Sequence, residues 1–220
     1  MRSLLIVSDS RATWSRALTV CEAAQERDDL NLLLALVGPL AASHPRDSLL
    51  DGIPVAARLG LHPGWALSMA EQTGNYITEL GAFIQVRRPD VVVSVTDRHE
   101  SLEVAVAGVR SGCHLAHIQG GEVSGSLDES MRHAITKLAH IHFPANAASA
   151  QRIERMGEDP RHIHNVGCPA TDLLLRVNLG VPPPDAGRFL LVSYNPVTTL
   201  PAERNYLHMR AVLEACQTFR

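Results

Sequence analysis

Three short polar clusters in this sequence carry the residue types that enzymes use for proton transfer and for binding anions. They are residues 8–11 (SDSR), residues 96–100 (TDRHE) and the longer run 117–129 (HIQGGEVSGSLDE). Arginines, and glycine-rich turns that lead into a helix, commonly hold phosphate groups. Carboxylates beside them can give or take protons. The three clusters together predict an anionic ligand and an acid–base site.

Each cluster follows a short apolar run, and the alternation of such runs with helical patterns predicts the fold. The runs typical of buried strands are residues 4–7, 31–37, 91–95, 114–118, 141–143 and 163–166. The helical patterns are residues 13–26, 63–86, 102–110, 128–139, 147–156 and 170–176. Residues 38–54 and 119–127 resemble loops. Strands that are apolar throughout belong to sheets covered on both faces. We therefore predict an α/β fold, a Rossmann-like doubly wound parallel sheet with helices on both faces.

Ligands of such sheets bind beyond the carboxyl ends of the strands. The three clusters lie at these ends, so we expect them to meet at one rim of the sheet. Each residue also has a simpler structural explanation. Arg11 could form a surface ion pair, Asp97 could cap a helix, and the glycines at 120–121 could form a turn that needs positive φ. The position of all three clusters at strand ends favours a site.

Composition excludes several classes of partner. The chain has 220 residues, a net charge of -3 and only 4% aromatic residues, so it offers neither a basic surface for nucleic acid nor a stacking platform for bases. No apolar stretch approaches the length of a membrane span, and residues 4–7 are too short for a signal peptide. We expect a soluble cytoplasmic protein without nucleic-acid or membrane partners. The four cysteines form no C-x-x-C pair and the eleven histidines no H-E-x-x-H motif, so we expect no metal site.

A proline-rich segment divides the chain. Residues 178–187 (NLGVPPPDAG) contain three consecutive prolines, which favour a stiff extended conformation. Beyond it, residues 189–194 predict a strand and residues 202–219 a helix, which are too few elements to bury a core. We predict an N-terminal Rossmann-like domain at 1–177, a linker at 178–187 and the truncated start of a second Rossmann-like domain at 188–220.

Several motifs, in order, resemble the UDP-N-acetylglucosamine 2-epimerase family, in its hydrolysing branch that supplies sialic-acid-type sugars. The longest is residues 117–143 (HIQGGEVSGSLDESMRHAITKLAHIHF). The others are 10–15 (SRATWS), 96–100 (TDRHE), 156–160 (MGEDP), 166–172 (VGCPATD) and 195–199 (NPVTT). The resemblance covers essentially the whole chain. It implies the first half of a two-domain GT-B-like architecture with a UDP-sugar in the interdomain cleft, no cofactor, and a homodimer for which helix 63–86 is a candidate contact.

The resemblance also implies a reaction and its residues. UDP leaves UDP-N-acetylglucosamine by elimination across C1–C2, the intermediate is 2-acetamidoglucal, and water then adds to give N-acetylmannosamine. The implied catalytic acids are Asp97, Glu122, Asp128 and Glu129. The implied substrate-binding residues are Arg11, Ser15, Arg98, Gln119, Arg132 and Asn195.

Two positions depart from the family pattern. Gln119 replaces the first acid of H-I-E-G-G-E, and Asn195 replaces the histidine of H-P-V-T-T. An amide forms hydrogen bonds but does not take up a proton in this pH range. Losing a catalytic acid or base costs about 10²–10⁴-fold in rate, and only part of the second domain is present. Three alternatives therefore remain open: an enzyme of altered specificity, an impaired homologue that acts as a sugar-nucleotide-binding or partner subunit, and a glycosyltransferase of the same architecture.

Overall fold

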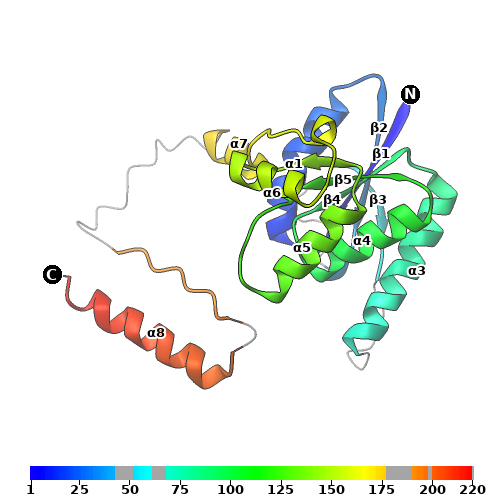
Figure 1. Ribbon diagram of the computed structural model, residues 1–220. Helices are drawn as coiled ribbons and strands as arrows, with labels where there is room; N and C mark the ends of the chain where they lie inside the picture. The colour runs from blue at the N-terminus through cyan, green and yellow to red at the C-terminus, as the bar shows by residue number, and fades with distance from the viewer. Residues whose placement is uncertain (43–51, 61–67, 177–189, 198–199, 220) are drawn as a thin grey trace. The chain divides into compact units, whose positions relative to one another are not determined.

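The computed structural model describes residues 1–42, 52–60, 68–176, 190–197 and 200–219 (Figure 1). The chain divides into two compact units, Met1–Arg176 and Val177–Arg220. The predicted linker at 178–187 lies outside the described residues.

The first unit is built on one six-stranded sheet in which every neighbouring pair of strands is parallel. The strands are β1 (Arg2–Ser8), β2 (Leu30–Leu36), β3 (Val55–Arg58), β4 (Val91–Val95), β5 (His114–Ile118) and β6 (Ile141–Phe143). Their order is β3-β2-β1-β4-β5-β6. The chain runs outward from β1 to β3 and then returns to β4 on the other side of β1. The switch point of this doubly wound sheet therefore lies between β1 and β4, and the predicted α/β class is confirmed.

Helices cover both faces of the sheet (Figure 1). On one face, α3 (Met69–Arg87), α4 (His99–Arg110) and α5 (Leu127–Leu138) contribute side chains to a single buried cluster. On the other face, α1 (Arg11–Gln25) and α7 (Pro169–Arg176) pack on a second cluster. The remaining helices of this unit are α2 (Gly38–Ala42), α6 (Ala147–Arg155) and a short 3₁₀ turn, Pro160–His162.

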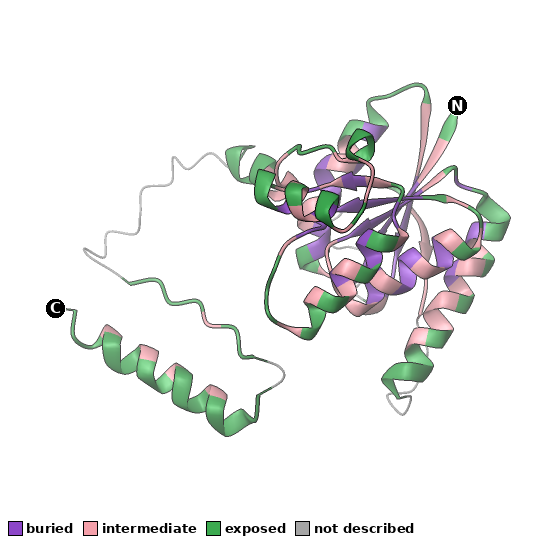
Figure 2. Ribbon diagram, in the orientation of Figure 1, coloured by how far each residue is buried: buried purple, intermediate pink, exposed green. Residues whose placement is uncertain are grey.

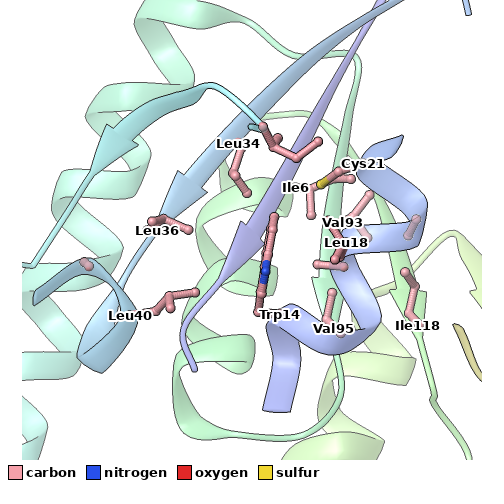
Figure 3. Packing of buried hydrophobic residues seen from close by; sticks show 14 residues of the cluster. Ile6, Trp14, Leu18, Cys21, Leu34, Leu36, Leu40, Val93, Val95 and Ile118 are labelled. Carbon is pink, nitrogen blue, oxygen red and sulfur yellow. The ribbon is translucent and has the colours of Figure 1, made fainter. Parts of the chain in front are cut away.

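The alternation of side chains along β1 explains why the strands are apolar throughout. Leu5 and Val7 belong to the cluster under α3, α4 and α5, whereas Ile6 belongs to the cluster under α1. Figure 3 shows Ile6 among Trp14 and Leu18 of α1. Successive residues of a strand point to opposite faces, so a sheet buried on both sides needs apolar residues at every position. Figure 2 shows this burial concentrated in the sheet and the inner faces of its helices.

Two predicted strands are wrong and one strand was missed. Residues 163–166 form only an isolated bridge, between Ile163 and His142, because the chain turns away at Gly167 with φ of +86°. Residues 190–197 have no regular structure, since within the described part of their unit no strand lies beside them to accept their hydrogen bonds. Conversely, the edge strand β3 was missed because it is only four residues long and half-buried.

The second unit contains α8 (Ala202–Cys216), which has no buried residue. Helix α4 begins at His99, one turn before the predicted residue 102. The start of the predicted helix at 63–67 lies outside the described residues. No helix in the described ranges is both long and apolar enough to cross a membrane. All four cysteines are free thiols.

Candidate functional site

The three polar clusters lie at neighbouring strand ends. The first follows β1, the second follows β4 and the third follows β5, and these strands are adjacent in the sheet. Because the strands are parallel, their carboxyl ends share one rim, at and beside the switch point. The sheet order thus brings the clusters together as the sequence predicted.

Two non-glycine residues at this rim have positive φ. Thr96, directly after β4, has φ of +66°, and Gln119, directly after β5, has φ of +63°. The Thr96 amide donates to the Ile118 carbonyl at 3.0 Å, and the Gln119 amide donates to the Phe143 carbonyl at 2.9 Å. The left-handed conformation costs a non-glycine residue about 1–2 kcal/mol. Such strain is concentrated at functional sites.

Arg132 of α5 joins the second cluster to the third. Its Nη2 forms an ion pair with Asp97 Oδ2, and its Nη1 donates to the Glu122 carbonyl oxygen at 2.8 Å. The Ser124 hydroxyl lies 3.5 Å from Nη2. The Arg132 side chain is only 5% exposed, whereas that of Asp97 is 24% exposed. Arg132 therefore holds a carboxylate that solvent or a ligand can still reach.

His117 supports this rim from inside the protein. Its Nε2 lies 2.8 Å from the Thr96 carbonyl oxygen, and its Nδ1 lies 3.2 Å from the Thr136 hydroxyl. Burial lowers the pKa of His117 to about 4, so the ring is neutral at pH 7. Because a carbonyl oxygen only accepts, Nε2 carries the proton and donates to Thr96. The first residue of the HIQGGE motif is thus a structural link between the ends of β4 and β5.

The glycines at 120–121 are required by close approach. A Cβ at Gly120 would lie 2.8 Å from His117 Nδ1. Gly121 has φ of +80°, and a Cβ there would lie 2.4 Å from the Ser149 carbonyl oxygen. Arg152 of α6 also donates to the Gly121 carbonyl. The simpler explanation of a positive-φ turn thus holds for Gly121 alone, and close approach explains both glycines.

We expect Gly121→Ala to destabilise the protein clearly more than Gly125→Ala. Both glycines have positive φ, but a Cβ at Gly125 meets nothing within 4 Å. Both variants carry the strain of positive φ. The difference between their losses in free energy of unfolding therefore measures the contact with Ser149. A difference of about 2 kcal/mol or more is expected for overpacking against the backbone. Urea unfolding of both variants measures it, and equal losses would contradict the clash.

Gln119 is held at both ends of its amide. Its Oε1 accepts from Arg16 Nε, and its Nε2 donates to Cys168 Sγ at 3.0 Å. The residue is only 7% exposed. Arg16 and Cys168 were not predicted as site residues, and they lie 103 and 49 residues away in sequence. Gln119 therefore links α1 to the segment before α7.

The two acids at the start of α5 have different surroundings. Glu129 accepts from the backbone amides of Ser124 at 2.6 Å and Gly125 at 2.7 Å, and these bonds lower its pKa. Glu129 thus shapes the loop that carries Glu122. Asp128 is exposed in the first turn of the helix.

The predicted residues of α1 lie at its start. Arg11 is the first residue of the helix and is exposed, and Ser10 before it caps the helix by accepting from the Thr13 amide. Ser15 donates its hydroxyl to the Ala12 carbonyl at 2.8 Å. Arg11 is therefore open to a ligand at the carboxyl end of β1.

Asn195 belongs to the second unit and is exposed there. Asn205 of α8 holds the neighbouring backbone, because its Oδ1 accepts from the Val197 amide and its Nδ2 donates to the Val197 carbonyl, both at 2.9 Å. Asn195 thus lies in the second unit, whereas the other predicted site residues lie in the first.

Three acids at this rim are buried: Asp9 and Glu100 belong to the predicted clusters, although their burial was not predicted, and Glu103 was not predicted as a site residue. Asp9 follows β1, and Glu100 and Glu103 lie on the inner face of α4. A signal was present, because the two glutamates are three residues apart and share a helical face with Val104 and Ala107. It was overlooked because the helix was predicted to begin only at residue 102.

Comparison with known proteins gives consistent matches over most of the chain. A family model described as UDP-N-acetylglucosamine 2-epimerase matches residues 25–219. A UDP-N,N'-diacetylbacillosamine 2-epimerase (hydrolyzing) of Legionella pneumophila is 33% identical over 186 residues, which are 80% of this chain and 48% of that protein. A UDP-N-acetylglucosamine 2-epimerase of Neisseria meningitidis is 37% identical over 141 residues, which are 60% of this chain and 37% of that protein.

Solved structures show the same fold. The crystal structure of UDP-GlcNAc 2-epimerase from Neisseria meningitidis, bound to UDP-GlcNAc, matches with a TM-score of 0.73 at 18% identity. The match covers 80% of this chain and 48% of that chain. The chain thus spans about half the length of the first curated relative that it matches.

Proposed function

The chain belongs to the UDP-N-acetylglucosamine 2-epimerase family, and from that premise we propose that it supplies the first nucleotide-sugar-binding domain of a hydrolysing 2-epimerase. The substrate is a UDP-activated 2-acetamido sugar, with UDP-N-acetylglucosamine as the first compound to test. The products are UDP and the free C2 epimer, which for this substrate is N-acetylmannosamine.

The proposed reaction has two steps. A carboxylate removes the proton from C2, the C1–O bond to UDP breaks, and the electron pair of the C2–H bond forms the C1–C2 double bond of 2-acetamidoglucal. Water then adds its oxygen to C1, and C2 receives a proton on the opposite face. Both steps need acid–base groups beside C1 and C2 and positive charge beside the diphosphate.

One observation carries this proposal: Arg132 holds Asp97 and the backbone of Glu122 on the same guanidinium, at the rim next to the switch point. Asp97 and Glu122 are the two acids that we assign to proton transfer, at C2 and from the water that adds to C1. Asp128 is a third acid open to the substrate, whereas Glu129 positions the loop. Arg11 and Ser15, at the start of α1, face the diphosphate.

The cellular setting follows from the same proposal. Four free thiols are typical of a reducing compartment, which supports a cytoplasmic enzyme. The family resemblance supports a homodimer and a place in the supply of sialic-acid-type sugars. Size-exclusion chromatography with light scattering tests the dimer, and a monomer at micromolar concentration contradicts it.

A product assay in D₂O, on protein in which this domain is joined to a complete second domain, tests the reaction itself. With UDP-N-acetylglucosamine, we expect release of UDP together with N-acetylmannosamine that carries deuterium at C2. UDP-N,N'-diacetylbacillosamine is the parallel substrate, because it is named for the Legionella relative. Release of the C2-retained sugar without deuterium indicates simple hydrolysis and contradicts the elimination. No product from either compound contradicts the proposed activity.

Altered sugar specificity is a second candidate, favoured by the environment of Gln119. A glutamate there would pair with Arg16, whereas the amide leaves the charge of Arg16 uncompensated. We expect Gln119→Glu, combined with Asn195→His, to change the ratio of the kcat/KM values for the two substrates rather than to raise both. Steady-state kinetics of the wild type and of this double variant measures the ratio. A large gain on UDP-N-acetylglucosamine alone contradicts altered specificity.

A further inference from the structure

Three buried carboxylates lie where β1 and β4 end, and the proposed reaction uses none of them. Asp9, Glu100 and Glu103 each expose only 3% of their surface, and we call them the acidic cluster. Acidic side chains are almost never this buried unless they are paired. Within the described residues, no group of His, Cys, Asp and Glu side chains is arranged to hold a metal ion. The cluster must therefore be explained by its protein partners.

Arg98 is the cation that two members of the cluster, Asp9 and Glu100, share. Glu103 instead accepts a hydrogen bond from Thr73. The Nε of Arg98 lies 3.1 Å from Asp9 Oδ1 and donates to Glu100 Oε2 at 3.1 Å. Its Nη2 donates to Glu100 Oε1 at 3.1 Å. This bidentate contact matches the planar fork of the guanidinium to the carboxylate and fixes the orientation of both.

The outer edge of Arg98 remains open. Its side chain is 40% exposed, and no described residue hydrogen-bonds to its Nη1. An arginine side chain loses about 2 kcal/mol of rotamer entropy when it is immobilised. Here the cluster has already immobilised it, so a ligand that binds the open N–H groups does not have to order the side chain.

The charge of Arg98 is also largely compensated. Burial alone would lower its pKa, but the hydrogen bond to Glu100 and the charges of Glu100, Asp9 and Asp128 raise it. A guanidinium with carboxylates on one side exerts a weak field on an anion beyond it. Its N–H groups still donate with full directionality. The best ligand for such a group is a neutral oxygen.

Arg11 and Arg16, unlike Arg98, have no carboxylate in the described residues that compensates their charge. Neither forms an ion pair with a carboxylate of the described residues. Both lie in the first two turns of α1, at the end where the helix dipole is positive. These two arginines keep the uncompensated charge that a diphosphate needs.

We propose that Arg98 recognises a neutral oxygen of the sugar, a hydroxyl or the acyl carbonyl, and that Asp9 and Glu100 are the residues that position it. The diphosphate is left to Arg11 and Arg16. This inference rests on the proposed function for its ligand, a UDP-activated 2-acetamido sugar. It deepens that function by dividing the rim into a sugar side and a phosphate side.

Titration with UDP and with UDP-N-acetylglucosamine, followed by amide chemical shifts, tests the division. We expect Glu100→Gln and Asp9→Asn to weaken binding of UDP-N-acetylglucosamine by about 10-fold, the size of one lost charge-assisted hydrogen bond. Binding of UDP should change by less than about 2-fold. Arg11→Gln should weaken binding of both compounds. Arg98→Lys keeps the charge but loses the fork, so it should behave like Glu100→Gln.

The ligand-free protein provides an independent readout of positioning. The Nε proton of Arg98 should exchange with water faster in Asp9→Asn and Glu100→Gln than in the wild type. Asp28→Asn is the matched control, because Asp28 is an exposed acid in the turn between α1 and β2. The inference is overturned if Asp9→Asn and Glu100→Gln lose affinity equally for UDP and for UDP-N-acetylglucosamine. It is also overturned if they lose affinity for neither compound. If the wild-type protein binds neither compound, the proposed function fails instead.

Discussion

Asp97→Asn is expected to lower the rate of UDP release from UDP-N-acetylglucosamine by about 10²–10⁴-fold, the usual cost of removing a catalytic base. Asparagine has nearly the same size, and its carbonyl oxygen can still accept from Arg132, so the loop keeps its geometry. Its amide takes up no proton in this pH range. The loss should therefore appear in kcat, with KM almost unchanged. Initial rates of UDP release over a range of substrate concentrations measure both constants.

Two further variants separate chemistry from positioning. Arg132→Lys keeps a positive charge but cannot bridge Asp97, the Glu122 carbonyl and Ser124 together, so it should lower both activity and stability. Asp28→Asn should leave both unchanged. If Asp97→Asn retains activity within about 3-fold of the wild type, Asp97 is not the base, and Glu122 becomes the candidate.

Glu103→Gln is expected to change the free energy of unfolding, relative to the wild type, more favourably at pH 8.5 than at pH 4. Burial, and to a smaller extent the charges of Glu100 and Asp9, raise the pKa of Glu103 from 4.5 to about 7, against the hydrogen bond that Thr73 donates at 2.7 Å. Its Oε2 atom is buried without a hydrogen-bond partner. The folded protein therefore binds the Glu103 proton more tightly than the unfolded chain does.

The sign of the effect follows from linkage. Below pH 4.5 the side chain is protonated in both states, and Glu103 contributes no pH dependence. Between pH 4.5 and 7 its contribution to stability falls as the pH rises. Above pH 7 the penalty is complete and amounts to roughly 3 kcal/mol, at 1.36 kcal/mol per pKa unit. Glutamine has no proton to lose and removes this penalty.

Urea unfolding of wild type and variant at pH 4 and pH 8.5 measures the effect. The substitution changes the free energy of unfolding by one amount at pH 4 and by another at pH 8.5. The cost of burying the amide is the same at both pH values, so it cancels when one change is subtracted from the other. Tyr76 of α3 also interacts with Glu103, and it is present in both proteins. Glu154→Gln, at an exposed position on α6, is the control and should show no such difference. The same change at both pH values would falsify the assignment of a raised pKa to Glu103.

Much of the fold could be predicted because it depends on short-range patterns. The predicted strands at 91–95, 114–118 and 141–143 agree to the residue with β4, β5 and β6. A central parallel strand must be apolar on both faces, so its ends are visible in the sequence. Edge segments are less constrained: the edge strand β6 was predicted, whereas the edge strand β3 was missed. The segment 163–166 forms only an isolated bridge, and the described part of the predicted strand at 189–194 has no regular structure.

The residue types at the site could also be predicted, but not all of their partners. The alternation of strands and helices placed Asp97, Arg98 and Gln119 at one rim, since parallel strands end on the same side. The bond from Arg16 to Gln119 joins residues 103 apart, and that from Gln119 to Cys168 joins residues 49 apart. No local pattern encodes such contacts, because they depend on how α1 and α7 pack on the sheet.

The sequence alone therefore determines the α/β class, the rim of the sheet and the acid–base character of its loops, because these follow from periodicity and residue chemistry. Which arginines are compensated by carboxylates depends on the tertiary structure. Arg98 is compensated by Asp9 and Glu100, while Arg11 has no carboxylate partner in the described residues. Charge interactions weaken with distance and with solvent. Which arginine remains available for an anion is decided only when folding sets these distances and buries the acids.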